Sequence, residues 1–169
     1  MRTFSSKELA EQDKRYLTNF INSLSGFKSL QLLGSINQEG QSNLAVFNSI
    51  FHVGANPPYI GLVVRPDGPE HDTLKNIVSK GFYTLNNVCE EFYQQAHQTS
   101  AKYADGVSEF EMTGLTEQFR EGCCAPFVAE SPVQYLLKLE QVIPIELNDT
   151  FFVIGSLQAA YVPADIQEE

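Results

Sequence analysis

The chain has 169 residues, of which 43% are hydrophobic and 19% charged, which predicts one domain, residues 1–169, with a substantial hydrophobic core. Its net charge of −10 argues against nucleic acid as a partner, because binding to a phosphate backbone needs a basic face. No stretch approaches the roughly 18 consecutive apolar residues of a membrane span, so no membrane partner is expected.

The first predicted element is a helix within the leading segment 1–26. Ser5 and Glu8 have the Ser-x-x-Glu spacing of a capping box, which begins a helix, and Gly26 is suited to end it. Between these signals apolar side chains recur at helical spacing: Leu9, Tyr16, Leu17, Phe20, Ile21 and Leu24. The pattern predicts one amphipathic helix ahead of the β-rich part of the chain.

Three strands are predicted in the next part of the chain, over residues 27–37, 43–47 and 59–65. The first two are joined by a hairpin turn at 38–41. The segment 48–58 mixes hydroxyl, amide, glycine and proline residues and is predicted to be a loop, since Pro57 and Pro58 would interrupt a regular ladder. Such a loop has backbone N–H groups that no sheet uses, so it can surround a planar polar ligand.

A polar turn is expected at 66–71, and a helix follows it. Asp72 or Thr73 can cap this helix and Gly81 can stop it. A further strand is predicted over 82–88. The segment 66–88 therefore places a helix N-terminus shortly after the strand that ends at residue 65.

The following region is predicted to be less regular. Residues 90–98 are expected to be helical, and residues 99–122 to form a loop with short helical pieces. From residue 133 to 140 apolar and polar side chains alternate, which predicts a strand with one buried face. Pro144 is expected to bend this strand or to confine it to an edge.

The chain is predicted to end in a turn at 147–150 and a strand over 151–161, with a bulge at Gly155. The fold class is therefore mainly β with short helices. About six strands with few helices favour a closed or split antiparallel barrel over a parallel sheet.

An anion site is the first candidate for function. The helix N-terminus at Thr73 offers free N–H groups, the Thr73 hydroxyl adds a donor, and Arg65 could bind the same group. The alternative is that Thr73 only caps the helix and Arg65 is a solvated strand end. Residues 105–169 hold two Lys or Arg against twelve Asp or Glu. The positive charge for an anion must therefore come from Arg65, Lys75 or Lys102.

A second candidate is the run from His97 to Lys102. Its two hydroxyls, an amide and a lysine could line a phosphate or a ribityl chain, with Ser100 and Lys102 as the expected contacts. The alternative is an ordinary loop, in which serine and threonine are common.

The histidines and cysteines predict neither a metal site nor a disulfide framework. The three histidines lack metal-ligand spacing, and Cys123 and Cys124 lack the gap of a redox CxxC pair. A reduced, cytoplasmic compartment is expected. No Walker loop, nucleophile elbow or Rossmann glycine fingerprint is present, so a nucleotide cofactor would be held in another way.

The ordered set of short motifs resembles the flavin reductase-like family of FMN-binding split barrels, the group that includes flavoredoxin. No single motif is specific, but their order and spacing cover roughly residues 28–163. The matching pieces are residues 43–45, 48–51, 57–58, the strand end at Arg65, 72–77, 81–86, 99–101, 108–110, 114–115, 125–126 and 130–131.

The resemblance implies a six-stranded antiparallel split barrel of Greek-key type that forms a homodimer, with FMN at the subunit interface. It implies that the segment after the second strand contacts the flavin through Asn48, Ser49, Ile50 and Phe51. It further implies that Arg65 and Thr73 meet the phosphate, and that Ser100 and Lys102 reach it from the later loop.

The function that the resemblance implies is oxidoreduction, in which FMN accepts a hydride from NADH or NADPH and passes electrons to flavin or a downstream acceptor. No residue is assigned as an acid or a base. The alternatives are a non-catalytic FMN-binding electron carrier or flavin store, and a barrel that binds another small ligand.

Two features depart from the family pattern. The sequence stops at Glu169 soon after the last predicted strand, and a longer helix than usual opens it. Both lead us to expect a pocket rim, and hence donor and acceptor contacts, that differ from those of relatives.

Overall fold

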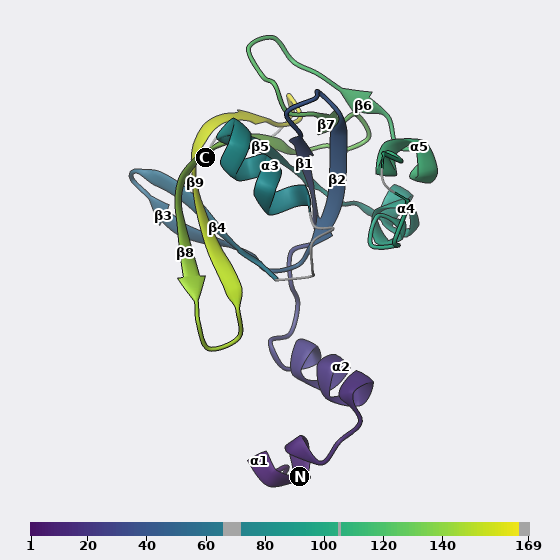
Figure 1. Cartoon of the computed structure of the whole chain (residues 1–169), viewed down its shortest axis with the longest axis vertical. Coiled ribbons are helices and arrows are strands. Elements are labelled where there is room, and N and C mark those ends of the chain that lie inside the picture. Colours follow the sequence, from purple (N-terminus) through teal and green to yellow (C-terminus); the bar gives the residue numbers. More distant parts are fainter. Residues whose placement is uncertain (66–71, 105, 166–169) are drawn as a thin grey trace.

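The computed structural model describes residues 1–65, 72–104 and 106–165, so the turn expected at 66–71 lies outside the described residues. The main element is an antiparallel sheet of seven strands in the order β2-β1-β5-β8-β9-β4-β3 (Figure 1). Its strands are β1 (Gln31–Ile36), β2 (Ser42–Phe47), β3 (Ile50–Ala55), β4 (Pro58–Val64), β5 (Phe82–Asn87), β8 (Gln134–Ile145) and β9 (Thr150–Tyr161). The predicted fold class is confirmed, with seven strands in place of six.

Short helices and a second, two-stranded sheet complete the fold. The small sheet pairs β6 (Glu117–Gln118) with β7 (Phe127–Val128). The helices are α1 (Ser6–Ala10), α2 (Lys14–Leu24), α3 (Asp72–Lys80), the 3₁₀ turn η1 (Glu90–Phe92), α4 (Tyr93–Gln98) and α5 (Glu109–Thr113). Within the described part of the chain, none of these helices has the length and apolar character needed to cross a membrane.

The sheet curls because its two edge strands are neighbours in sequence. Strands β2 and β3 lie at opposite ends of the strand order, yet only Asn48 and Ser49 connect them. Two residues cannot span an open seven-stranded sheet, whose strands lie about 4.8 Å apart. Ser49 continues the β3–β4 ladder and anchors the link to β4: its carbonyl accepts the Val63 N–H at 3.2 Å, and its hydroxyl donates to the Val63 carbonyl at 2.8 Å. The result is a barrel that is closed at this link and split along the rest of the β2 edge.

The segment 48–58, predicted to be a loop, is mostly strand, and that prediction is wrong. β3 pairs with β4 from Ile50 opposite Leu62 to Ala55 opposite Pro58, with a register shift between His52 and Gly54. Pro58 is compatible with this hairpin because it is the first residue of its strand, where a missing N–H costs least.

The leading helix is broken into two. The capping box at Ser5 and Glu8 forms as predicted. However, Asp13 accepts hydrogen bonds from the backbone N–H groups of Arg15 and Tyr16 at 2.9 and 3.2 Å, and thereby caps a second helix. The prediction of one continuous helix is therefore wrong, while its amphipathic pattern continues through α2.

The barrel interior holds the main hydrophobic core, whose fully buried members include Leu33, Leu62, Ile77, Leu85, Leu137 and Val153. Tyr83 lies among them with its hydroxyl beside Gly155, where an added Cβ would come within 2.3 Å of that oxygen. A register shift does fall at Gly155, as expected, but the extra residue is Glu140 of β8, opposite that glycine; a second shift leaves Gln158 of β9 without a partner. Gly155 is also a position of close contact.

Candidate functional site

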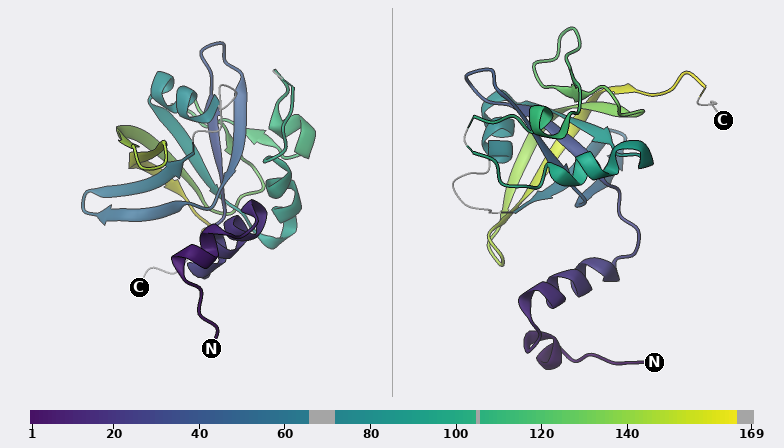
Figure 2. Two further views of the ribbon diagram at one scale, coloured as in Figure 1. Left: turned by 60° about the horizontal axis from the view of Figure 1, so that its bottom comes forward. Right: turned by 90° about the vertical axis from the view of Figure 1, so that its right-hand side faces the viewer.

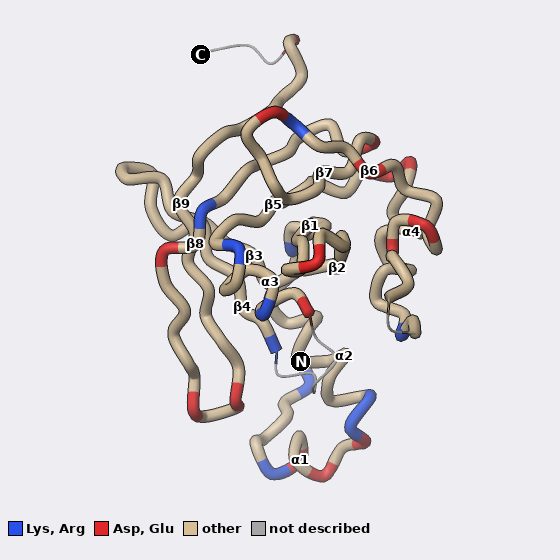
Figure 3. Tube along the Cα trace, turned by 45° about the horizontal axis from the view of Figure 1, so that its top comes forward, with Lys and Arg blue, Asp and Glu red and all other residues tan. Residues whose placement is uncertain are grey.

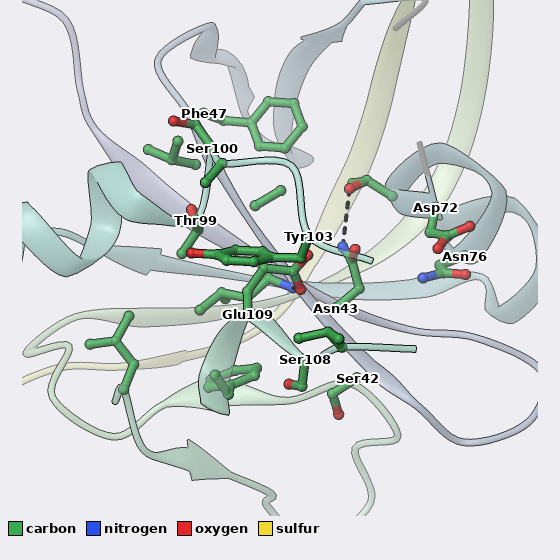
Figure 4. A pocket seen from close by; sticks show the side chains of 18 of the residues that line it. Ser42, Asn43, Phe47, Asp72, Asn76, Thr99, Ser100, Tyr103, Ser108 and Glu109 are labelled. Atoms are coloured by element: carbon green, nitrogen blue, oxygen red, sulfur yellow. Dashed lines mark hydrogen bonds between the residues drawn. The ribbon is translucent and has the colours of Figure 1, made fainter. Parts of the chain in front are cut away.

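A cleft of about 1330 Å³ opens beside the free edge of β2. Its walls include residues of β2, the Asn48–Ser49 link, the end of β4, the start of α3, and the segments 97–104 and 106–111. Figure 4 shows labelled side chains from β2, from α3 and from these two segments around the cleft. The cleft therefore lies where the barrel is split, and it brings together segments that lie between Leu30 and Glu117 in the sequence.

The edge of β2 turns main-chain groups toward this cleft. Asn43 and Ala45 stand opposite Ser35 and Leu33 in the β1–β2 ladder. Leu44 directs its N–H away from β1, because it donates to Glu109 Oε2 at 3.0 Å. Since main-chain direction alternates along a strand, Val46 faces the same way as Leu44. An exposed strand edge of this kind presents donors and acceptors in a row, as a planar heterocycle requires.

A buried polar network fixes α3 against this edge. Asn43 Nδ2 donates to Thr73 Oγ1 at 3.1 Å and to Ser35 Oγ at 3.2 Å, and Asn76 Nδ2 donates to Ser35 Oγ at 3.3 Å. Thr73, Asn76 and Ser35 are all buried. The network holds the N-terminal turn of α3 at the cleft wall, where the helix dipole and the first-turn N–H groups, which have no partner within the helix, favour an anion.

The charged groups of the cleft are mixed. Among the described lining residues, Arg65 and Lys102 are the Lys or Arg side chains, and both are exposed. Four carboxylates also line it: Asp72, Glu109, Glu111 and Glu117. A bound anion would therefore depend on local contacts with the two cations and the helix end, since the cleft as a whole is not positive.

Glu109 is the carboxylate whose environment differs most from water. It is half-buried, and burial raises its pKa above the ordinary 4.5, with the nearby Asp72 charge acting in the same direction. The hydrogen bond from the Leu44 N–H acts in the opposite direction, toward a lower pKa. Burial is the larger effect, so the ionised form of Glu109 is partly destabilised in the folded protein.

The segment after α4 forms the wall opposite α3. Tyr103 lies across the cleft near Glu109, and its hydroxyl donates to the Gln98 carbonyl at 3.1 Å (Figure 4). Ser100 Oγ donates to the His97 carbonyl at 2.7 Å, so its hydrogen is used within its own turn. Lys102 is free of this constraint, because none of the described residues forms a salt bridge or side-chain hydrogen bond with it.

Six of the eight residues predicted to hold a cofactor line the cleft: Asn48, Ser49, Arg65, Thr73, Ser100 and Lys102. The other two point elsewhere. Ile50 packs against the barrel core, and Phe51 stacks on Phe152 with ring centroids 5.2 Å apart. Which of the eight contact a ligand stays a prediction.

Sequence reasoning did not single out Asn43, Tyr103 or Glu109 as site residues. The signal for Asn43 was an amide inside an otherwise apolar strand. Glu109 lies in the family-like piece 108–110 but was not marked as a site residue, and Tyr103 carried no local signal. Their place in the cleft depends on how the segments 97–104 and 106–111 lie beside β2.

Comparison with known proteins supplies the family. The family model for the flavin reductase like domain matches residues 28–169. An uncharacterised protein of Aquifex aeolicus is 30% identical over 139 residues, which cover 81% of this chain and 70% of that protein.

Solved structures show the same fold. A Shewanella frigidimarina protein, assigned as a flavin reductase with a split barrel domain, is 43% identical and aligns over 99% of this chain and 83% of its own, with a TM-score of 0.95. Flavoredoxin of Desulfovibrio vulgaris aligns over 87% of this chain and 76% of its own at 21% identity, with a TM-score of 0.75. At that identity the second likeness concerns the fold alone.

Proposed function

This chain belongs to the flavin reductase like domain family, and from that premise we propose that it is an oxidoreductase that binds FMN in the cleft beside β2. NADH or NADPH would supply the electrons, and free flavin or a downstream acceptor would receive them. The fold and the family support a flavin reductase-type oxidoreductase; the choice of FMN and of a nicotinamide donor is our proposal.

The observation that carries the proposal is the combination, in one cleft, of a free strand edge with an anion site. The N–H and C=O groups of β2 around Val46 match the alternating acceptors and donors of a flavin's pyrimidine ring. Arg65, Thr73 and Lys102, together with the N-terminus of α3, would hold the phosphate. A planar ring system with a phosphate tail fits both features at once.

A bound flavin would supply the redox chemistry, accepting a hydride from nicotinamide and passing electrons on. The protein's own groups would bind and orient it. The β2 edge would fix the ring, the Asn43–Thr73 contact would keep α3 in position, and Tyr103 would limit the access of water from the opposite wall. None of the described residues is assigned as an acid or a base.

We further propose that the protein is a homodimer with FMN near the interface. The cleft is open on one side, and a second copy could complete it.

The test is to titrate the purified protein with FMN, FAD and riboflavin by absorption and fluorescence, and then to measure oxidation of NADH and NADPH with each flavin. We expect FMN to bind more tightly than riboflavin and to support turnover. Tight FMN binding without turnover above the free-flavin background would favour an electron carrier or flavin store. A protein that binds none of the three flavins would contradict the proposal.

A further inference from the structure

The N-terminal arm, residues 1–28, stands away from the barrel (Figures 1 and 2). No residue of α1 or α2 is buried, although α2 carries a continuous apolar stripe. Ile21 and Leu24 expose 49% and 64% of their surface. Phe20 contacts Phe4 and Tyr16, with ring centroids 4.9 and 6.0 Å apart, so the arm has a small aromatic cluster of its own.

The arm lacks the burial that normally stabilises a helix. An isolated helix of 11 residues is marginal in water, and tertiary packing of an apolar face usually supplies its stability. The first side-chain bond from this region to the barrel is that of Ser29, whose hydroxyl lies 3.4 Å from the Ile50 carbonyl. The apolar stripe of α2 must therefore be covered by something other than the described part of its own barrel.

The related Shewanella frigidimarina structure indicates that this pose of the arm is reproducible. The alignment covers almost all of this chain, so it includes the arm, and the TM-score is too high for residues 1–28 to lie in a different place. A segment without contacts to its own barrel would not keep one orientation in two related proteins. An external surface that both share would explain it.

A second uncovered apolar surface lies on the outside of the sheet. Residues directly opposite each other on paired strands share a face. One row of opposite residues crosses β3, β4 and β9 and consists of Phe51, Gly61 and Ile154. A second row crosses β4, β9 and β8 and consists of Val63, Phe152 and Ile143. The two rows meet where Phe152 stacks on Phe51. Since Leu62 and Val153 point into the core, these residues point outward. Phe51 and the neighbouring Val53 are 45% and 43% exposed. We call this set, with Val53, the outer apolar face.

We propose that the arm of each chain packs on the outer apolar face of a second copy of the same chain. Its apolar stripe and this face then bury one another in a symmetric exchange. Homodimer formation alone does not say which surfaces meet, and this assignment does not depend on flavin binding. It pairs the two apolar surfaces for which the described residues offer no partner.

Charge supports a second copy as the occupant. Residues 1–28 hold five Lys or Arg against three Asp or Glu, a net charge of +2. Residues 29–169 hold six against eighteen, a net charge of −12. The basic arm and the acidic barrel attract one another between copies (Figure 3). A membrane surface is less suited, because binding to anionic lipid normally uses a cluster of about 4–8 Lys or Arg without interspersed acids.

Site-specific photo-crosslinking of the full-length chain tests the proposal. A photoreactive phenylalanine analogue at Ile21, on the apolar stripe, should give a covalent product of dimer mass. The same analogue at Asn19, on the polar side of α2, is the matched control and should give much less. Peptide mapping should place the crosslink near Phe51 or Ile143.

A second measurement tests whether the apolar stripe of α2 stabilises the dimer or only lies near the second copy. The double substitution Leu17→Asp and Leu24→Asp should weaken the dimer at least about tenfold by light scattering, whereas Asn19→Asp should leave it unchanged. Because the arm contributes nothing to the core, the thermal unfolding of the barrel in the monomeric variant reports that it is folded. An Ile21 crosslink of monomer mass alone, a monomeric wild-type protein, or capture of the arm only by anionic vesicles would each overturn the proposal.

The outcome is independent of the proposed flavin chemistry. A crosslinked dimer that binds no flavin would leave this inference standing and would refute the proposed function. If the protein binds flavin but its arm does not touch a second copy, the proposed function would stand and this inference would be refuted.

Discussion

Arg65 lies at the end of β4 and lines the same cleft as the first turn of α3 and Lys102. If it binds a phosphate, Arg65→Ala should weaken FMN binding by roughly 1.5–3 kcal/mol, or about 10- to 150-fold, because a charge-assisted hydrogen bond is lost. Riboflavin, which has no phosphate, should bind as before. Fluorescence titration with both ligands measures this, and Arg65→Lys is the control that keeps the charge. An equal loss for both ligands would rule out the phosphate role.

Glu109 predicts a pH dependence of stability. Burial raises its pKa, so the folded state binds the proton more tightly than the unfolded state does. Ionisation of Glu109 therefore lowers the free energy of unfolding. The loss is complete above the pKa of the folded state and disappears as pH falls below the pKa of the unfolded state, near 4.5. Glu109→Gln still offers an oxygen to the Leu44 N–H, so it should be more stable than wild type at pH 7 and equal to it in acid.

Urea unfolding of both proteins at several pH values between about 3.5 and 7 measures this difference in the free energy of unfolding. That pH range spans the titration of a carboxyl group. Glu111→Gln changes an exposed position of the same helix and serves as the matched control. A variant less stable than wild type at pH 7, or a difference that does not vary with pH, would contradict the interpretation.

Tyr83 and Gly155 form a tightly packed pair inside the barrel. A Cβ at residue 155 would lie 2.3 Å from the Tyr83 hydroxyl, so Gly155→Ala should destabilise the fold by about 1–3 kcal/mol through overpacking. The buried Tyr83 hydroxyl has no hydrogen-bond partner among the described residues, and burial raises its pKa. Tyr83→Phe should therefore be neutral or stabilising, and should recover part of the loss in the double variant. Additive effects of the two changes in urea unfolding would show that they do not interact.

At the scale of single elements, the Asn48–Ser49 link determines how the barrel closes. Ser49→Ala removes the hydrogen bond to the Val63 carbonyl and should lower the free energy of unfolding by about 0.5–1.5 kcal/mol. Asn48→Ala, at the exposed neighbouring position, should change it by less than about 0.5 kcal/mol. Denaturant unfolding of the two variants compares them directly. Equal effects would mean that the link contributes only its length.

Most elements could be predicted because their signals are local. The helix of residues 72–80 has a glycine stop at Gly81, and the strand β5 begins directly after it at Phe82. β3 was missed because the register shift between His52 and Gly54 breaks its alternation and two prolines follow it. The break between α1 and α2 was missed because Asp13 ends one helix and begins the next without interrupting the apolar stripe.

The candidate site was predictable only where its residues lie at the ends of elements. Arg65 directly follows a strand, and Thr73 lies in the first turn of a helix, so each gave a local signal. The contacts that complete the site join distant positions: Asn43 meets Thr73 across 30 residues, and Leu44 meets Glu109 across 65. Such contacts depend on the closure of the sheet, and no periodicity in one sequence reports that closure.

At the scale of the whole molecule, ligand binding should appear as thermal stabilisation. If FMN binds the folded chain alone, a concentration about 100 times its dissociation constant adds about 2.7 kcal/mol. For a domain of this size each kcal/mol raises Tm by about 2–4 °C, so we expect a rise of about 5–10 °C. Differential scanning fluorimetry, with riboflavin and free phosphate as matched ligands, measures it. No shift at saturating FMN would favour a barrel that binds another ligand.

Synthesis on the ribosome gives the two-residue link a further consequence. The β3–β4 hairpin, residues 50–64, is made well before β9, Thr150–Tyr161, the strand that β4 joins in the sheet. Until β9 emerges, the apolar residues of the nascent hairpin remain unpaired and at risk of binding other chains. Arg65 follows that hairpin, so the cleft takes its final shape only after β9 has been made. A chaperone that protects this nascent hairpin would therefore raise the yield of active protein more than one that acts on the finished barrel.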